Sequence, residues 1–266
     1  MTIYRALTIA GSAARGGAGI QADIKTFQER DVFGMSAITA IVAPHPITRS
    51  GIFPQSIEAI EAQYYTAVND IGIDALKTGM LFSEEVILRV AELLEEKKFE
   101  NLVVDPVIIG KMGSQLLKDD AVNAMKEKLF PLAKMITPNM PEAAKLLNIL
   151  ELKSINDMKE AAIELHKLGP HYVLIKGGRL KGPAIDILYD GNTFEMFEAE
   201  RIDTINTNGA GCTYSAAITA ELAKGKSVHE AVKIAKDFIT VAIRHSLSFK
   251  DQVGPTNHSA YRKYNH

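Results

Sequence analysis

Short apolar runs rich in β-branched residues alternate along the chain with longer amphipathic segments. The short runs are typical of buried strands, and the longer ones gather apolar residues on one helical face, as Ile20, Ile24 and Phe27 do. Strands are predicted over residues 5–11, 35–43, 73–79, 101–107, 133–139 and 171–178. Helices are predicted over residues 19–30, 56–72, 83–98, 154–169, 211–224 and 228–245.

The stretch 186–199 departs from this rhythm, because two alternating segments flank Asp190 and Gly191 and predict a β-hairpin. Elsewhere the repeated strand–helix units predict a mostly parallel central sheet with helices on both faces. No internal repeat, low-complexity tract or long linker interrupts the pattern. We therefore expect an α/β fold with a short antiparallel hairpin, built as one domain over residues 1–266.

Composition excludes several classes of protein. Of the 266 residues 47% are hydrophobic and 23% charged, and the net charge of −2 gives no basic excess for nucleic acid. No apolar run approaches the ~18 residues that span a bilayer, and the first residues show no signal-peptide pattern. The one cysteine excludes an internal disulfide and fits a reducing compartment. We expect a cytoplasmic protein with neither nucleic-acid nor membrane partners.

The segment around Cys212 carries the most specific chemical signal. It reads NTNGAGCTYSAA over residues 206–217, with two glycines just before a predicted helix. Successive amides at a helix start form an anion nest, and the helix dipole there favours the ionised form of a thiol. A lone cysteine is more often a small buried hydrophobe. Its place after Gly209, Ala210 and Gly211 favours a functional thiol instead.

Ligands of open α/β sheets bind at the carboxyl ends of the strands, where further polar residues stand out. Asp105 ends an apolar strand, and a carboxylate there is costly unless it is solvated, paired or bound to a cation such as Mg²⁺. Asn139 and Glu142 lie three residues apart at a helix start, as a capping pair or as groups that hold the water shell of Mg²⁺. Lys176 precedes two glycines, either as a phosphate contact or as a solvated turn lysine.

The glycine-rich turn AGSAARGGAG after the first strand is less informative. It has no GK[ST], and it lacks a clean G-x-G-x-x-G with an acidic residue on a second strand. Spacing alone favours a solvent-facing Asp23 over one that faces a ligand. The seven histidines show no metal-ligand spacing.

Taken together, these motifs resemble those of the vitamin kinases of the ribokinase-like superfamily, in the branch of hydroxymethylpyrimidine/phosphomethylpyrimidine kinases and related pyridoxal kinases. The resemblance spans nearly the whole chain, in the order TIAGS, GGAGIQADIKTF, GMSAITAIV, IDALKTGM, VVDPVI, TPNMPEA, IKGGR, NGAGCTYSAA and VGPTNH. It implies a ribokinase-like fold and phosphorylation of a ring hydroxymethyl group, with ATP and Mg²⁺. By analogy it also implies a homodimer.

The resemblance implies a role for each matching position. Cys212 would be the catalytic base, and the amides of Gly209, Ala210 and Gly211 would form the anion hole for the γ-phosphoryl group. The ATP contacts would be Lys176, Gly177, Asn139 and Thr207. Mg²⁺ and its waters would be held by Asp105, Glu142 and Asn139. The pocket for the vitamin ring would be lined by Gly11, Ala18, Asp23, Met80, Val107 and His45. Lys111 would lie in a lid over the phosphates.

The chain departs from the pattern of this branch in its substrate loops. Residues 13–15 read AAR where the branch reads D-S/T-S. Pro44 lies in residues 43–46, where pyrimidine kinases read A-Q-N-T, and a proline cannot replace the hydrogen bond of that glutamine to the pyrimidine. Asn208 replaces the usual histidine before G-x-G-C, and Gly110 replaces the second lid cysteine of some pyridoxal kinases.

Two acceptors are compatible with these motifs. The missing glutamine, the GAGC form and the tail VGPTNHSAYRK favour a B6 vitamer, which means a pyridoxal, pyridoxine or pyridoxamine kinase. A hydroxymethylpyrimidine/phosphomethylpyrimidine kinase of thiamine biosynthesis or salvage is the alternative, and dual activity is conceivable because both rings carry a similar hydroxymethyl group. The altered loops also suggest a non-catalytic vitamin-binding protein, although the intact phosphate-side motifs argue against it. A nicotinamide-dependent dehydrogenase rests on the glycine turn alone.

Overall fold

The computed structural model describes residues 2–110, 116–249 and 253–264. The chain divides into two compact units, of which unit 1 comprises Met1–Leu81 and Ile202–His266 and unit 2 comprises Phe82–Arg201. Each unit has α/β architecture, so the predicted fold class is confirmed. That the two units form a single domain stays a prediction. Among the described residues, no helix combines the length and the apolar character that crossing a bilayer requires.

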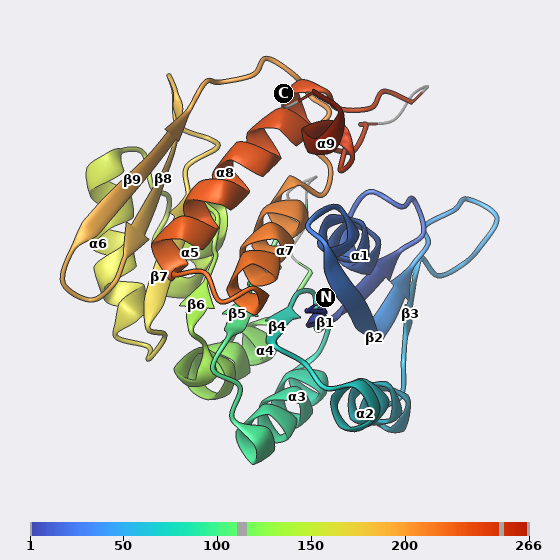
Figure 1. Cartoon of the computed structure of the whole chain (residues 1–266). Coiled ribbons are helices and arrows are strands. Elements are labelled where there is room, and N and C mark those ends of the chain that lie inside the picture. Colours follow the sequence, from blue (N-terminus) through green and yellow to red (C-terminus); the bar gives the residue numbers. More distant parts are fainter. Residues whose placement is uncertain (1, 111–115, 250–252, 265–266) are drawn as a thin grey trace. The chain divides into compact units, whose positions relative to one another are not determined.

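In unit 1, β1 lies between β2 and β4 and pairs with both in parallel, while the short β3 runs antiparallel to β2. The strands are β1 (Tyr4–Ala13), β2 (Val32–Val42), β3 (Ile52–Pro54) and β4 (Ala75–Thr78). The helices are α1 (Gly19–Glu29), α2 (Ile57–Tyr65) with a π-helical continuation (Thr66–Ile71), α7 (Ala210–Ala223), α8 (Val228–Arg244) and α9 (Ala260–Tyr264). Figure 1 shows α7 alongside both α1 and α8, which it contacts.

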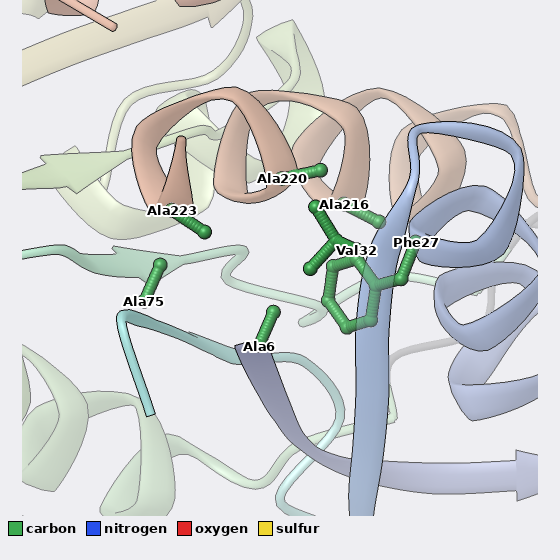
Figure 2. Packing of buried hydrophobic residues seen from close by; sticks show 7 residues of the cluster. All are labelled: Ala6, Phe27, Val32, Ala75, Ala216, Ala220 and Ala223. Carbon is green, nitrogen blue, oxygen red and sulfur yellow. The ribbon is translucent and has the colours of Figure 1, made fainter. Parts of the chain in front are cut away.

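A face of small side chains lets α7 pack closely on the strands of unit 1. Every residue of α7 from Thr213 to Ala223 is buried, and alanine leaves little bulk between the helix and the strands. The cluster that α7 forms with α1, β1, β2 and β4 comprises Ala6, Phe27, Val32, Ala75, Ala216, Ala220 and Ala223 (Figure 2). β1 is buried on both faces over residues 6–11, as expected of an inner strand of a mostly parallel sheet.

In unit 2, β5, β6 and β7 pair in parallel, and β7, β8 and β9 pair antiparallel. The strands are β5 (Leu102–Val104), β6 (Met135–Ile136), β7 (Tyr172–Lys176), β8 (Ala184–Tyr189) and β9 (Phe194–Ala199). The helices are α3 (Glu84–Lys97), α4 (Asp119–Ala124) with π-helical (Met125–Leu129) and 3-10 (Phe130–Leu132) continuations, α5 (Met140–Leu147) and α6 (Ile155–His166). Figure 1 shows the β8–β9 hairpin beside β7, with α6 packed against β7 and β8.

The hairpin is confirmed at the predicted place. The side chain of Asp190 accepts hydrogen bonds from the amides of Asn192 and Thr193, and Gly191 adopts a φ of +96°. These residues therefore form the turn that reverses the chain. The sequence did not indicate three short elements, namely β3, α4 and α9. Each is too short to establish a hydrophobic period of its own, and tertiary contacts decide its conformation.

Candidate active site

The start of α7 is fixed by a close approach of two backbone segments in unit 1. Gly209 is the N-cap of α7 and has a φ of +76°, a conformation that side chains disfavour. A Cβ atom on Gly209 would lie 1.7 Å from the carbonyl oxygen of Gly17, in the glycine turn that follows β1. Only glycine therefore fits at this position, and the helix start is seated directly against that turn.

The nest of amides predicted before Cys212 is present in part. The amide of Ala210 donates to the carbonyl oxygen of Thr207 at 3.2 Å, so this donor is engaged in the turn. The amides of Gly209 and Gly211 have no acceptor among the residues that the structure describes. Both amides belong to the positive end of α7. The half-buried thiol of Cys212 thus follows two amide donors available to an anion.

His258 is a residue near the start of α7 that sequence reasoning did not place in the candidate site. Its Nε2 lies 3.1 Å from Oγ1 of Thr213, the residue that follows Cys212. Burial lowers the pKa of His258 to about 4, with a further lowering by Lys25 and an opposing effect of Glu29, so the imidazole is neutral near pH 7. The only sequence signal was its place in the motif VGPTNH, which lies far along the chain from Cys212.

Of the residues predicted to line a ring pocket, those in unit 1 take different positions. A Cβ on Gly11 would lie 2.5 Å from Cε of Met80, so these two residues are in contact. Ala18 is the N-cap of α1, and its Cα lies within 3.1 Å of where a Cβ of Gly209 would be. His45 is exposed in a surface turn, where its Nδ1 accepts a hydrogen bond from the amide of Ile47.

Asp23 is completely buried, so the solvent-facing position that its spacing favoured is wrong. Its Oδ2 accepts hydrogen bonds from Nζ of Lys77 at 3.1 Å and from Oγ1 of Thr8 at 2.7 Å. Lys77 lies on β4 and Thr8 on β1, so the partners of Asp23 come from strands that helical periodicity does not reveal. A role of Asp23 in lining the ring pocket stays a prediction.

In unit 2, three neighbouring parallel strands bring polar groups together at their carboxyl ends. Lys176 ends β7, and its Nζ donates to Oδ1 of Asp105, beyond β5, at 2.9 Å. Thr137, beyond β6, donates to the same oxygen at 3.1 Å. The side chain of Lys176 is 12% exposed and that of Asp105 is 3% exposed. Lys176 is therefore a half-buried ion-pair partner of Asp105 and not a solvated turn lysine.

Asn139 and Glu142 form a capping box at the start of α5. The side chain of Asn139 accepts from the amide of Glu142 at 3.0 Å, and Oε2 of Glu142 accepts from the amide of Asn139 at 2.9 Å. Burial raises the pKa of Glu142 to about 8; the charge of Lys176 opposes this rise and that of Asp105 adds to it. The predicted capping pair is thus present, and the charge of Asp105 contributes to the raised pKa of Glu142.

This pair of carboxylates fits a Mg²⁺ ion held largely through water. The described residues contain no group of three or more histidine, cysteine, aspartate or glutamate side chains suited to a metal. Mg²⁺ needs fewer, because it keeps several waters and binds through one or two carboxylates together with substrate phosphates. Burial and the charge of Asp105 both raise the pKa of Glu142, and a nearby cation would favour the ionised form of this carboxyl group.

Three of the remaining predicted contacts have backbone groups that are already hydrogen-bonded. The amide of Gly177 donates to Oδ1 of Asp186 at 2.9 Å, so it is held by β8. Val107 is half-buried and its amide bonds the carbonyl oxygen of Asp105. Thr207 accepts the turn hydrogen bond from Ala210 described above. Lys111 lies outside the described residues.

These features define an α/β protein of the phosphotransferase type. Amide donors beside a thiol at a helix start, and a lysine paired with a carboxylate at strand ends, are kinds of group that phosphoryl transfer can use. A sequence profile described as phosphomethylpyrimidine kinase matches residues 14–257. The chain belongs to the phosphomethylpyrimidine kinase family, whose members are ATP-dependent kinases of small-molecule alcohols.

The relatives include kinases named for each of the two candidate acceptors. The chain is 51% identical to the pyridoxine kinase of Bacillus subtilis (strain 168), over 98% of each protein. It is 45% identical to the hydroxymethylpyrimidine/phosphomethylpyrimidine kinase of the same organism, over 99% of this chain and 97% of that protein. The solved ADP complex of Bacillus subtilis pyridoxal kinase has a TM-score of 0.93 at 51% identity and covers 98% of this chain and 99% of that chain.

Proposed function

We propose that this kinase transfers the γ-phosphoryl group of ATP to the ring hydroxymethyl group of a B6 vitamer. The observation that carries the proposal is the position of Cys212 at the start of α7, after the amides of Gly209 and Gly211. The 51% identity to a pyridoxine kinase over nearly the full length supports the B6 acceptor.

In this mechanism Cys212 is the general base. Its Sγ accepts the proton of the hydroxymethyl group while the hydroxyl oxygen attacks the γ-phosphorus. The bond between the γ-phosphorus and the β,γ-bridging oxygen breaks, and ADP leaves with the electron pair. The amides of Gly209 and Gly211 donate to the transferring phosphoryl oxygens, where preorganised donors stabilise the spread negative charge.

The carboxylates of unit 2 are assigned to Mg²⁺. Asp105 and Glu142, with Asn139, would hold the waters of the ion, which neutralises phosphate charge when bound. Lys176 would then exchange its contact with Asp105 for one with a phosphate oxygen, because an ammonium group donates hydrogen bonds to carboxylate and phosphate oxygens alike. Lys111 is kept as the predicted lid residue.

The second candidate acceptor is hydroxymethylpyrimidine or its phosphate. A 45% identical relative bears that name, which keeps this alternative and dual activity open to test. Pro44 argues for the B6 ring because its side chain has no group that could hydrogen-bond the pyrimidine. It packs against Gly51, where an added Cβ would lie 3.0 Å from Cα of Pro44. The glutamine amide that pyrimidine kinases of this branch carry here is missing from the loop after β2.

The experiment compares kcat/KM for pyridoxal, pyridoxine and hydroxymethylpyrimidine in the wild type and in Cys212→Ala and Pro44→Gln. We expect the wild type to prefer the B6 vitamers and Cys212→Ala to lose at least about a hundredfold in kcat, the scale of a positioned base. Pro44→Gln should shift preference toward hydroxymethylpyrimidine by about fivefold to tenfold, the worth of one hydrogen bond. Pro46→Gln, in the same exposed turn, is the matched control and should leave the preference unchanged.

Each part of the proposal has its own contrary result. Wild-type turnover by Cys212→Ala would disprove the base assignment. Equal kcat/KM for all three acceptors would disprove the B6 preference and leave a dual kinase. Binding of pyridoxal without consumption of ATP would favour the vitamin-binding protein instead.

Two further expectations belong to this proposal. We expect a homodimer, by analogy with kinases of this branch, and sedimentation equilibrium would measure it. We also expect the enzyme to act in the cytoplasm, where ATP is made and where a lone thiol stays reduced.

A further inference from the structure

The C-terminal segment of unit 1, residues 253–258, lies against the start of α7. The amide of Asn208 donates to the carbonyl oxygen of Gly254 at 3.1 Å, and the amide of Thr256 donates back to the carbonyl oxygen of Asn208 at 3.2 Å. The amide of Gly254 also donates to the side chain of Asn206 at 2.8 Å. The segment therefore holds Asn206 and Asn208, just before Gly209, by three hydrogen bonds.

The same segment is anchored elsewhere in unit 1, so it can transmit rigidity to the nest. The carbonyl oxygen of Pro255 accepts from the amide of Leu247, and the amide of Asn257 donates to the carbonyl oxygen of Ala242 at the end of α8. On the glycine turn, a Cβ added to Gly17 would lie 2.5 Å from Cβ of Pro255. The segment thus joins the end of α8, the glycine turn and the start of α7.

Its two buried polar side chains converge on the first turn of α7. Oγ1 of Thr213 donates to the carbonyl oxygen of Gly209 at 2.9 Å. Oγ1 of Thr256 lies 3.2 Å from the same hydroxyl oxygen, and Nε2 of His258 lies 3.1 Å from it. A hydroxyl has one proton, which Thr213 gives to Gly209, so Thr213 accepts from Thr256 and from the Nε2–H of a neutral His258.

We propose that His258 and Thr256 are positioning residues of this kinase, which hold Thr213 and through it the turn of backbone that carries the amide donors and Cys212. Neither side chain touches the reacting atoms in this scheme. The inference rests on the proposed function of Cys212 and its nest, and it adds the residues that keep that geometry. The physical reason is that a helix end has few hydrogen bonds of its own and frays unless side chains complete it.

The test replaces the donor without emptying the space. His258→Leu removes the Nε2–H, whereas His258→Gln places an amide N–H near the same point and should restore function. Thr256→Val removes the second hydroxyl at nearly constant volume and keeps the backbone hydrogen bonds. The matched control is His229→Leu, because His229 is exposed near the start of α8.

Two readouts are measured for every variant. The first is kcat and KM with pyridoxal and MgATP, and the second is hydrogen–deuterium exchange of the peptide covering residues 206–216. We expect His258→Leu to lower kcat about tenfold, the consequence of losing one buried hydrogen bond, with KM changed less than about threefold. Exchange of residues 209–213 should become faster, and His258→Gln and His229→Leu should match the wild type in both measurements.

The proposal requires that His258→Leu show both a lower kcat and faster exchange of residues 209–213. One of these changes without the other overturns it. Faster exchange confined to residues 253–264 with wild-type kcat would mean that His258 stabilises only its own segment. If His258→Leu does not fold, Thr256→Val is judged by the same criteria. Failure of the base assignment is separable, because it would appear as turnover by Cys212→Ala while the exchange result still reports on the helix start.

Discussion

At the scale of single residues, Glu142 is held by opposing demands. Its carboxylate caps the backbone of Asn139, a role that needs only an oxygen acceptor. Burial nevertheless raises its pKa to about 8, above the ordinary 4.5. Between these two values the folded protein binds more protons at this site than the unfolded chain does. The free energy of unfolding therefore falls as pH rises through this window.

Glu142→Gln removes this pH dependence and keeps the cap, because a glutamine oxygen also accepts from the Asn139 amide. We expect the free energy of unfolding of the wild type to fall more than that of the variant between about pH 5 and pH 8, as measured by urea titration. If the carboxylates hold Mg²⁺, added Mg²⁺ should also raise the melting temperature of the wild type more than that of the variant.

Glu230→Gln is the matched control for this measurement. Glu230 forms the corresponding capping box with Ser227 at the start of α8, and there the side chain is exposed. Hydrogen bonds from Ser227 lower the pKa of Glu230, so its removal should not alter the slope above pH 5. Parallel slopes for the wild type and Glu142→Gln would contradict the raised pKa of Glu142.

At the scale of elements, the seat of α7 depends on two glycines in contact. Gly209 combines a φ of +76° with an approach to Gly17 that leaves no room for a Cβ. Gly225, just beyond the end of α7, has a φ of +78°, and apart from its chain neighbours none of the described residues comes within 4 Å of its added Cβ. Gly209 and Gly225 share a left-handed backbone, but only Gly209 is crowded. Comparing substitutions at these two positions therefore separates the effect of backbone strain from that of crowding.

Gly225→Ala should cost about 1 kcal/mol, the strain of a left-handed backbone alone. Gly209→Ala should cost clearly more free energy of unfolding, because the backbone of the glycine turn must also move. It should in addition lower kcat, since the amide donors move with it. Urea titrations and steady-state kinetics on both variants measure this, and equal destabilisation would show that the contact with Gly17 gives way readily.

At the scale of the whole molecule, two buried groups with opposite effects on the pH dependence of stability lie in different units. His258 belongs to unit 1, and burial holds its pKa near 4 instead of 6.5. In this interval the unfolded chain binds more protons than the folded protein, so stability is lost as pH falls from 6.5 toward 4. Glu142 belongs to unit 2, and its contribution is lost as pH rises.

We expect His258→Gln to lose less stability than the wild type when pH is lowered from about 6.5 to about 4.5. Denaturant unfolding at the two pH values measures the difference, with His229→Gln as the surface control. If the protein unfolds in two transitions, the effect should fall on the transition of unit 1. An identical loss in the wild type and His258→Gln would contradict the lowered pKa.

Much of the architecture was predictable from local pattern. Strand–helix alternation predicted the parallel pairing of strands, and the Asp190–Gly191 pair predicted the β8–β9 turn. The capping pair Asn139–Glu142 was predictable because its partners are three residues apart. In each case the physical cause acts within a few residues, so the sequence expresses it directly.

The chemistry of individual side chains depended on partners distant in sequence. Asp23 looked solvent-facing until β1 and β4 supplied Thr8 and Lys77. The sequence offered Lys176 as a phosphate contact or a solvated turn lysine and did not reveal its ion pair with Asp105, which follows β5. Desolvation and ion pairing are properties of a place in space, which periodicity cannot register.

The sequence by itself determined the α/β alternation, the helix start before Cys212 and, through its ordered motifs, the kinase family. Only the tertiary structure decided which amides of the nest are already engaged, and that the C-terminal segment with His258 completes the first turn of α7. The reason is the range of the forces involved. Local propensity and glycine geometry act between neighbours, whereas burial and hydrogen bonding join residues that only folding brings together.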